Sequence, residues 1–310
     1  MKKIVISIIS YNQENLISRA LDSVLCQKDW GLYKIVVSDD CSFDRTWDIL
    51  QDYQCRYPDL FILHRNENNL GIYGNVEKVE SLLPQGELYG SLSGDDEYCK
   101  GYFEAIQKYI RDHRIDTDEP VGFFSDWKSV SPEGNEEIHT QKAVLSEYPL
   151  LSLKLRGLVS NRSFMVTKCV RDSYGPMILD RGLALAEGDY DIQPFLFIST
   201  AYYIQKVTSI YYTRVGVSSR LSVKESDYLT TQSIIKWKYF LEGNRYILNS
   251  TDEHYARYEL LRAQFYLRPS IIKICRMMNH FCLGQLPGFK PSIKIVIHLL
   301  LSYIKYWISK

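Results

Sequence analysis

The stretch "IVISIIS", residues 4–10, is a continuous run of apolar and small residues, most of them β-branched. Such a run is typical of a central strand in a parallel sheet, because that strand is buried on both faces. Two lysines precede the run, so a secretory signal peptide is the competing interpretation. The run is short for that purpose, and no small-residue cleavage site follows it. We therefore predict a first buried strand at 4–10.

Helical and strand patterns alternate from this strand onward. Apolar residues recur on one helical face in "ENLISRALDSVLCQ", and Ser42 is a plausible N-cap for a second helix. The predicted helices are 14–27, 42–53, 68–83 and 100–110, and the predicted strands are 4–10, 33–40, 60–65, 87–97 and 121–127. This alternation implies βαβ crossovers and a mostly parallel, Rossmann-like α/β sheet with helices on both faces.

The alternation ends after residue 128. The pattern there predicts a polar loop at 129–147, a strand pair at 158–168, a helix at 188–199, a strand at 209–214 and helices over 225–265. We expect one domain over 1–222, with halves at about 1–128 and 129–222. A C-terminal helical extension is expected over 223–310.

Composition and charge narrow the class of protein. Of the 310 residues, 45% are hydrophobic and 24% charged, as in ordinary globular proteins. The seven cysteines form no Cys-x-x-Cys pair, which is typical of reduced thiols in a cytoplasmic protein. Residues 1–259 hold 29 basic and 37 acidic side chains, whereas the remainder holds eight basic and none acidic. The acidic body disfavours nucleic-acid binding.

Acidic residues follow two of the predicted strands. "SDD" ends the strand at 33–40, "SGDDE" ends the strand at 87–97, and Tyr11 follows the first strand. The carboxyl ends of parallel strands meet at the edge where open α/β sheets bind ligands. Adjacent carboxylates are oxygen ligands suited to Mg²⁺ or Mn²⁺ together with substrate phosphates. An Asp-Asp turn is the simpler alternative for either group alone, but the recurrence at successive strand ends favours a metal and diphosphate site.

Four ordered blocks of this chain resemble glycosyltransferase family 2, the inverting enzymes with the GT-A fold. The blocks are "VISIISYNQENLISRALDSVLCQ", "IVVSDDCSFDRTWDIL", "NLGIYGN" and "LSGDDEY". The resemblance implies a GT-A domain over 1–222, with a nucleotide-sugar half followed by an acceptor half. It also implies a nucleotide-diphosphate-sugar donor and a divalent cation, Mn²⁺ or Mg²⁺. Ser93 stands where many members of the family have another Asp.

By position, the resemblance implies roles for the residues of these blocks. Ile9 and Tyr11 would line the nucleotide, with Tyr11 against the base, and Asp40 would accept a hydrogen bond from the imino N–H of that base. Asp95 would lie near the ribose, and Asp96 would bind the metal.

Two further residues are expected at the nucleotide sugar. Asn75 would lie on the base and ribose side, although a turn with Asn caps explains the same pattern equally well. Arg214 follows the last strand, as an Arg does in the family, and is expected to approach the diphosphate. A solvated surface arginine is the alternative.

The catalytic base is expected in "LAEGDYDIQPFLF", where the family has a Glu-Asp pair at the start of a helix. Asp189 is the predicted base and Glu187 the second candidate, since Gly188 stands where Glu is common. An inverting transfer needs one carboxylate to accept the proton of the attacking hydroxyl. The alternative role for Asp189 is a helix N-cap.

The C-terminal segment "IKIVIHLLLSYIKYWI", residues 293–308, is too short and too charged for a transmembrane span. Its lysines and His298 form one polar stripe, which indicates an interfacial amphipathic helix on an anionic leaflet. Packing on the protein body or on another subunit is the alternative, and a homo-oligomer is possible. The predicted location is cytoplasmic, peripheral to the inner face of the cell membrane.

The sequence therefore predicts an inverting, metal-dependent glycosyltransferase that acts on a glycan or lipid-linked acceptor, as in bacterial surface polysaccharide biosynthesis. One alternative is a non-catalytic subunit that binds a sugar nucleotide or serves as a scaffold, since Ser93 and Gly188 depart from the family pattern. A nucleotidyltransferase is less well supported, because no Gly-rich basic loop follows the first strand.

Overall fold

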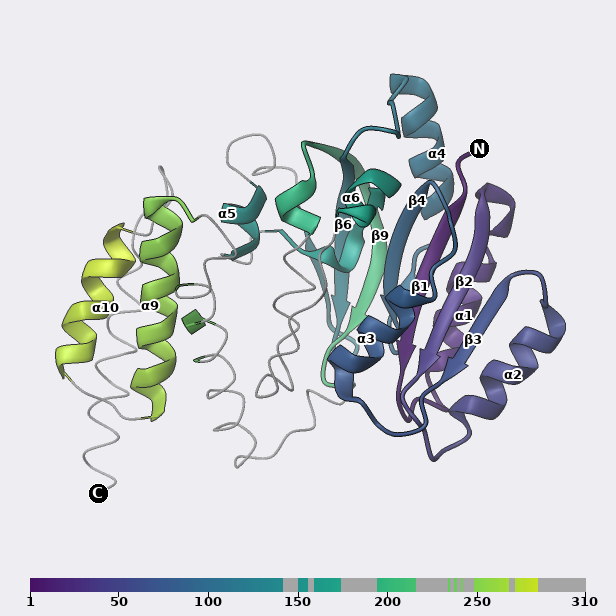
Figure 1. Ribbon diagram of the computed structural model, residues 1–310, viewed down its shortest axis with the longest axis horizontal. Coiled ribbons are helices and arrows are strands. Elements are labelled where there is room, and N and C mark those ends of the chain that lie inside the picture. Colours follow the sequence, from purple (N-terminus) through teal and green to yellow (C-terminus); the bar gives the residue numbers. More distant parts are fainter. Residues whose placement is uncertain are drawn as a thin grey trace. The chain divides into compact units, whose positions relative to one another are not determined.

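The computed structural model describes residues 1–141, 150–155, 159–173, 194–215, 234, 237–238, 241, 248–267 and 271–283 (Figure 1). These residues belong to two compact units. The first unit contains all the described strands, and the second contains helices α9 and α10. The predicted domain boundary near 222 and the basic tail at 293–308 lie outside the described residues.

The described strands form one mixed sheet in the order β3-β2-β1-β4-β8-β6-β9-β5, with β7 paired to β6. Its strands are β1 Ile4–Ser10, β2 Leu32–Asp39, β3 Phe61–Arg65, β4 Leu88–Ser93, β5 Glu97–Tyr98, β6 Val121–Val130, β7 Glu136–His139, β8 Phe164–Thr167 and β9 Thr200–Tyr212. The core β3-β2-β1-β4 is parallel throughout, as is the pair β6-β9. Strand β8 is antiparallel to both of its neighbours. The predicted α/β class with a mostly parallel core is confirmed.

The helices connect the parallel strands as crossovers. They are α1 Ile17–Leu25, α2 Thr46–Arg56, α3 Gly71–Ser81 and α4 Tyr102–His113, with short helices α5 Leu150–Leu155 and α6 Lys168–Asp172 and the 3₁₀ turns η1 Lys28–Trp30 and η2 Asn161–Ser163. The strand order runs outward through β2 and β3 and then returns to β4 beside β1. Because such crossovers are right-handed, this reversal puts α3 on the face opposite α1 and α2.

Strand β1 is buried on both faces, as its sequence predicts. Ile4, Ile6 and Ile8 have no exposed surface and pack in the same core as the apolar residues of α1. Val5 points to the other face and is equally buried. Full burial of each such side chain contributes about 1.5–3 kcal/mol relative to exposure, so β1 fixes the centre of the sheet.

The start of the second helix differs from the prediction. Helix α2 begins at Thr46, and Ser42 is not its N-cap. Ser42 instead donates its hydroxyl to Asp39 at the end of β2. Asp44 accepts the backbone N–H of Thr46, so this aspartate serves the first turn. The prediction of Ser42 as the N-cap is wrong, because the buried carboxylate of Asp39 binds its hydroxyl.

The predicted loop at 129–147 also differs from the structure. Strand β6 continues to Val130 and forms a hairpin with β7, whose exposed, charged residues carry no apolar alternation. Within 158–168, the described residues contain one strand, β8, preceded by η2, rather than a pair. Strand β9 is longer than expected and covers Thr200–Tyr212.

The second unit contains α9, Ser250–Leu267, and α10, Ile271–Leu283. They pack through buried Tyr258, Phe265, Ile274 and Met277. These two helices agree with the expected helical extension. Among the helices described, none combines the length and the apolar character needed to cross a membrane.

A histidine pair connects these two helices. The Nδ1 atoms of His254 and His280 lie 2.9 Å apart, so one of them must be unprotonated to accept the hydrogen bond. Burial lowers the pKa of His280, as do the neighbouring His254 and Arg257, while Glu253 opposes the change. The unfolded chain therefore binds more protons near neutrality than the folded chain does.

We expect the α9–α10 pair to lose stability as the pH falls through about 6.5, because the depressed pKa of His280 makes protonation favour unfolding. Hydrogen exchange of the amides in 250–283, corrected for intrinsic rates, should accelerate between about pH 7.5 and about pH 5.5. His280→Gln should remove this acceleration, and His113→Gln in α4 should not. Equal protection at both pH values in the wild-type chain would contradict the expectation.

Candidate functional site

Three predicted groups meet at one edge of the sheet. Ser10 pairs with Asp39 at the ends of β1 and β2, and Ile9 pairs with Ser93 at the end of β4. The segments that begin at Tyr11, Asp40 and Gly94 therefore leave three neighbouring strands at the same edge. The expected co-location of the acidic groups is confirmed.

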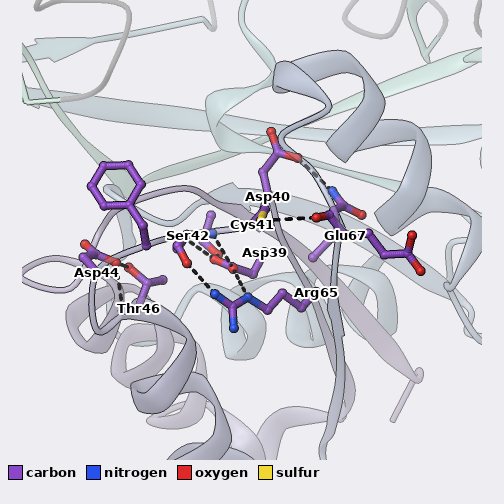
Figure 2. Close-up of polar contacts among 12 residues, drawn as sticks. Asp39, Asp40, Cys41, Ser42, Asp44, Thr46, Arg65 and Glu67 are labelled. Carbon is purple, nitrogen blue, oxygen red and sulfur yellow. Dashed lines mark hydrogen bonds and ion pairs between the residues drawn. The ribbon is translucent and has the colours of Figure 1, made fainter.

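The carboxylate of Asp39 organises the loop after β2 (Figure 2). It has no exposed surface and accepts the hydroxyl of Ser10 at 3.1 Å, and the hydroxyl and backbone N–H of Ser42 at 2.5 and 3.0 Å. The Nε of Arg65 lies 3.7 Å from its Oδ2. Cys41, between the two hydrogen-bonded residues, adopts φ +60°. A buried carboxylate with this many donors fixes the loop on which Asp40 stands.

Asp40 is held by the start of α3. It is 3% exposed, and its carboxylate accepts the Nδ2 of Asn66 at 2.9 Å and the backbone N–H groups of Leu70 and Gly71 at 2.8 and 2.9 Å. The N-terminus of a helix favours a negative charge. Asp40 is thus anchored at the position where the family resemblance expects contact with the base, and that contact remains a prediction.

Asn75 joins α3 to the ends of the two central strands. Its Nδ2 donates to the carbonyls of Ser10 and Ser38 at 3.4 and 3.0 Å, and its Oδ1 accepts from Asn66 at 3.1 Å. The residue is 2% exposed. Each of these contacts is with the protein, so in this structure Asn75 positions the edge of the sheet; its predicted contact with the nucleotide is not tested.

Replacing Asn75 by Ala should lower the free energy of unfolding by about 1–3 kcal/mol, because buried strand-end carbonyls would lose their donor. Chemical denaturation of the full chain measures this change. Asn68→Ala is the control, since Asn68 is exposed on the loop before α3. A loss for Asn75→Ala no larger than for the control would contradict the anchoring role.

Tyr11 and Ile9 lie beside this loop. Both are partly exposed, and the ring of Tyr11 lies edge-to-face with that of Phe43 at 6.3 Å between centroids. Phe43 is 83% exposed. Two aromatic rings at the sheet edge provide an apolar surface of the kind on which a nucleotide base stacks.

The acidic turn follows β4 directly. The backbone N–H of Asp96 donates to the carbonyl of Ser93 at 3.1 Å, which closes the turn. A Cβ at Gly94 would lie 2.2 Å from Oε1 of Gln13 and 3.0 Å from Cδ1 of Ile17, so the turn packs closely on the segment after β1. This close approach brings Asp95 and Asp96 to the same edge as Tyr11 and Asp40.

Asp96 is partly buried beside a second carboxylate. Burial and the charge of Asp95 raise the pKa of Asp96 to about 7. The backbone N–H of Tyr212, at 3.1 Å from Oδ1, opposes this rise, as do the charges of Arg162 and Arg19. The carboxylate is therefore short of positive charge even with two arginines nearby.

Tyr212, at the end of β9, connects this turn to the second half of the sheet. Its hydroxyl donates to Glu97, and the guanidinium of Arg19 lies 3.6 Å from the centroid of its ring. Arg19 also donates to the carbonyl of Asp95 at 2.7 Å. Sequence analysis missed both residues. The available signals were that Arg19 is the only basic residue of α1 and that an aromatic pair ends β9.

The acidic turn has the donor chemistry for a hard divalent cation. Among the described residues no hydrogen bond is made to Oδ2 of Asp96, which leaves that oxygen for a ligand. No group of three or more His, Cys, Asp or Glu with metal-binding geometry occurs in the described part of the chain. Mg²⁺ is usually bound in proteins by one or two carboxylates together with substrate phosphates.

The remaining predicted residues are Asp189, Glu187 and Arg214. Asp189 and Glu187 fall outside the described residues. Arg214 is exposed, has φ +60° and forms an ion pair with Glu133 of the β6–β7 hairpin. Its described ion-pair partner is thus Glu133, and its predicted role toward the diphosphate is not tested.

Asp96→Asn should separate stability from metal binding. At about pH 8 the variant without metal should be more stable than the wild type, by about 1–2 kcal/mol after allowance for solvent screening, because the desolvated charge beside Asp95 is removed. Mn²⁺ and a nucleoside diphosphate should raise the melting temperature of the wild type and not that of the variant. Asp112→Asn, on exposed α4, is the control. An equal ligand-induced shift in Asp96→Asn would exclude the metal role.

Known proteins resemble this chain in sequence and in fold. Residues 5–157 match the family model described as "Glycosyl transferase family 2". An uncharacterized protein of Mycobacterium bovis is 38% identical over 88 residues, which are 28% of this chain and 25% of that protein. The alignment therefore spans only about a quarter of the relative's length.

Solved structures share the fold at low sequence identity. S. aureus TarS 1–349 in complex with UDP-GlcNAc has a TM-score of 0.59 at 17% identity, covering 90% of this chain and 79% of TarS. The mannosyltransferase PcManGT from Pyrobaculum calidifontis, in complex with GDP-Man and Mn²⁺, has a TM-score of 0.53 at 11% identity, covering 100% and 88%. The fold is GT-A, and residues 5–157 carry the match to glycosyl transferase family 2.

Proposed function

We propose that this protein transfers a sugar, with inversion, from a nucleotide-diphosphate-sugar to a glycan or lipid-linked acceptor with the help of a divalent cation. The observation that carries the proposal is the meeting of Tyr11, Asp40 and the Asp95–Asp96 turn at one edge of the sheet. The family match covers the same residues. A divalent cation would supply the positive charge that such an edge lacks, and it would also bind the diphosphate.

Each of these residues is proposed to contact a different part of the donor. Tyr11 and Asp40 would contact the nucleotide base, Asp95 the ribose, and Asp96 would hold Mn²⁺ or Mg²⁺ through the oxygen that no described hydrogen bond uses. When bound, the cation neutralises charge on the diphosphate. Arg19 keeps Asp95 in place through its carbonyl, so the two aspartates face the ligand from a fixed turn.

Transfer itself requires an acceptor hydroxyl and a base. The hydroxyl oxygen attacks the anomeric carbon from the face opposite the diphosphate, the bond to the diphosphate breaks, and the proton passes to a carboxylate. Asp189 is the proposed base, with Glu187 as the second candidate. Both assignments rest on the family resemblance of 185–197.

Donor turnover distinguishes a catalyst from a binding subunit. We expect the wild-type chain to be stabilised by at least one nucleotide sugar with Mn²⁺ and to hydrolyse or transfer that donor. Asp189→Asn should reduce kcat by about 10²–10⁴-fold, because it removes the base, and should leave donor binding intact. Glu119→Gln, on an exposed loop, is the control. Binding without any turnover in the wild type would favour the non-catalytic alternative.

The acceptor is proposed to be a membrane-associated glycan of bacterial surface polysaccharide biosynthesis. The support is the basic, apolar segment at 293–308, proposed to lie on the inner face of the cell membrane. Sedimentation of the full chain with anionic vesicles tests the membrane contact, and removal of 293–310 should abolish it at moderate salt.

A further inference from the structure

Arg162 stacks on the aromatic rings of Tyr211 and Trp127, and this contact leads to one further inference, which rests on the proposed function. We propose that Arg162 binds the β-phosphate of the donor and stabilises it as the leaving group, so that a guanidinium works beside the divalent cation. The assignment follows from how Arg162 is held, from its lack of an ion-pair partner in the described residues, and from its position relative to Asp96.

Arg162 is held in place by aromatic rings. It stands in η2, and its guanidinium carbon lies 4.1 Å from the ring centroid of Tyr211 and 5.1 Å from that of Trp127. The ring of Trp127 also stacks on that of His139, with the two ring centroids 3.8 Å apart and an angle of 12° between the ring planes. His139 is fixed in turn by the hydroxyl of Ser129 at 2.9 Å. Stacking orients the planar guanidinium and leaves its N–H edges available for hydrogen bonds.

Arg162 forms no ion pair with the described residues, although its charge acts on Asp96. Three other arginines of the same unit form ion pairs: Arg65 with Asp39, Arg171 with Glu80 and Arg214 with Glu133. Arg162 is exposed and contacts rings only. A preorganised guanidinium with unused donors is suited to bind an anion such as phosphate in a two-pronged manner.

The position of Arg162 connects it to the acidic turn. Its stacking partner Tyr211 is followed by Tyr212, whose backbone N–H binds Asp96 at 3.1 Å. Successive residues of a strand point to opposite faces, so Tyr211 and Tyr212 carry one arginine each, Arg162 and Arg19, on the two faces of β9. The charges of both guanidinium groups act on Asp96.

The charge balance of the loaded site favours the donor as the ligand. Asp95 and Asp96 carry one negative charge each, and the diphosphate of a nucleotide sugar carries two more. A divalent cation and Arg19 offset three of these four charges. Arg162 supplies the fourth, and it does so on the side where charge grows as the bond from the anomeric carbon to the β-phosphate oxygen breaks.

The test compares nucleotide binding with turnover. The nucleoside diphosphate that binds the wild type best with Mn²⁺, from UDP, GDP, dTDP, CDP and ADP, is measured against its monophosphate in each variant. Arg162→Gln should weaken binding of the diphosphate about tenfold and leave the monophosphate within about twofold, because only the former has a β-phosphate. The kcat for the donor should fall about 10²-fold. Arg162→Lys should lie between, because it keeps the charge without the planar fork.

Arg56→Gln is the matched control. The guanidinium of Arg56 lies 4.1 Å from the ring of Tyr53, the same stacking distance, but on α2 beside Asp52. It should change neither binding nor turnover, and melting temperatures show whether each variant is folded.

Two outcomes would overturn the assignment. In one, Arg162→Gln and Arg162→Lys both bind the diphosphate as the wild type does. In the other, diphosphate binding is unchanged and only the KM for the acceptor rises, which would assign Arg162 to an acceptor phosphate. Absence of any nucleotide binding in the wild type would instead reject the proposed function itself, so the two failures are distinct.

Discussion

The repulsion among carboxylates at one edge of the sheet is the constraint on which the arrangement of this site depends. Asp39, Asp40, Asp95 and Asp96 follow neighbouring strands, and each charge must be satisfied where it stands. Asp39 is satisfied by hydroxyls, a backbone N–H and Arg65, and Asp40 by an amide and the start of α3. Asp96 keeps a raised pKa despite its own donor and two nearby arginines. Asp39 and Asp40 stabilise the loop, and Asp96 remains available for a ligand.

The contacts of the acidic turn come from both halves of the sheet. The turn that contains Asp95 and Asp96 is closed locally by Ser93, but its charges are balanced from α1 and from the end of β9. Residues more than a hundred positions apart in sequence therefore set the electrostatics of one carboxylate. The parallel pairing of β6 with β9 fixes where Tyr211 and Tyr212 lie relative to that turn.

The sequence predicted the parallel core well because its signal is local. The run at 4–10 is apolar on both faces, and the acidic groups directly follow strands whose order the crossover rule restricts. It failed at Ser42, where a tertiary contact with Asp39 outweighed capping, and at β7, whose strand is exposed and charged. Arg19 and Tyr212 could not be recognised from spacing, because their neighbours come from distant segments. The predicted base at 187–189 stays a prediction.

The bond between Tyr212 and Asp96 is made by the main chain, whereas the contacts of Tyr212 with Glu97 and Arg19 use its ring and hydroxyl. Substitutions at position 212 can therefore remove the ring contacts and still keep the backbone hydrogen bond to Asp96. Every amino acid except proline supplies the same N–H. Proline is the one replacement that the genetic code offers to remove it. Relatives could thus differ widely at this position and still hold the corresponding carboxylate in place.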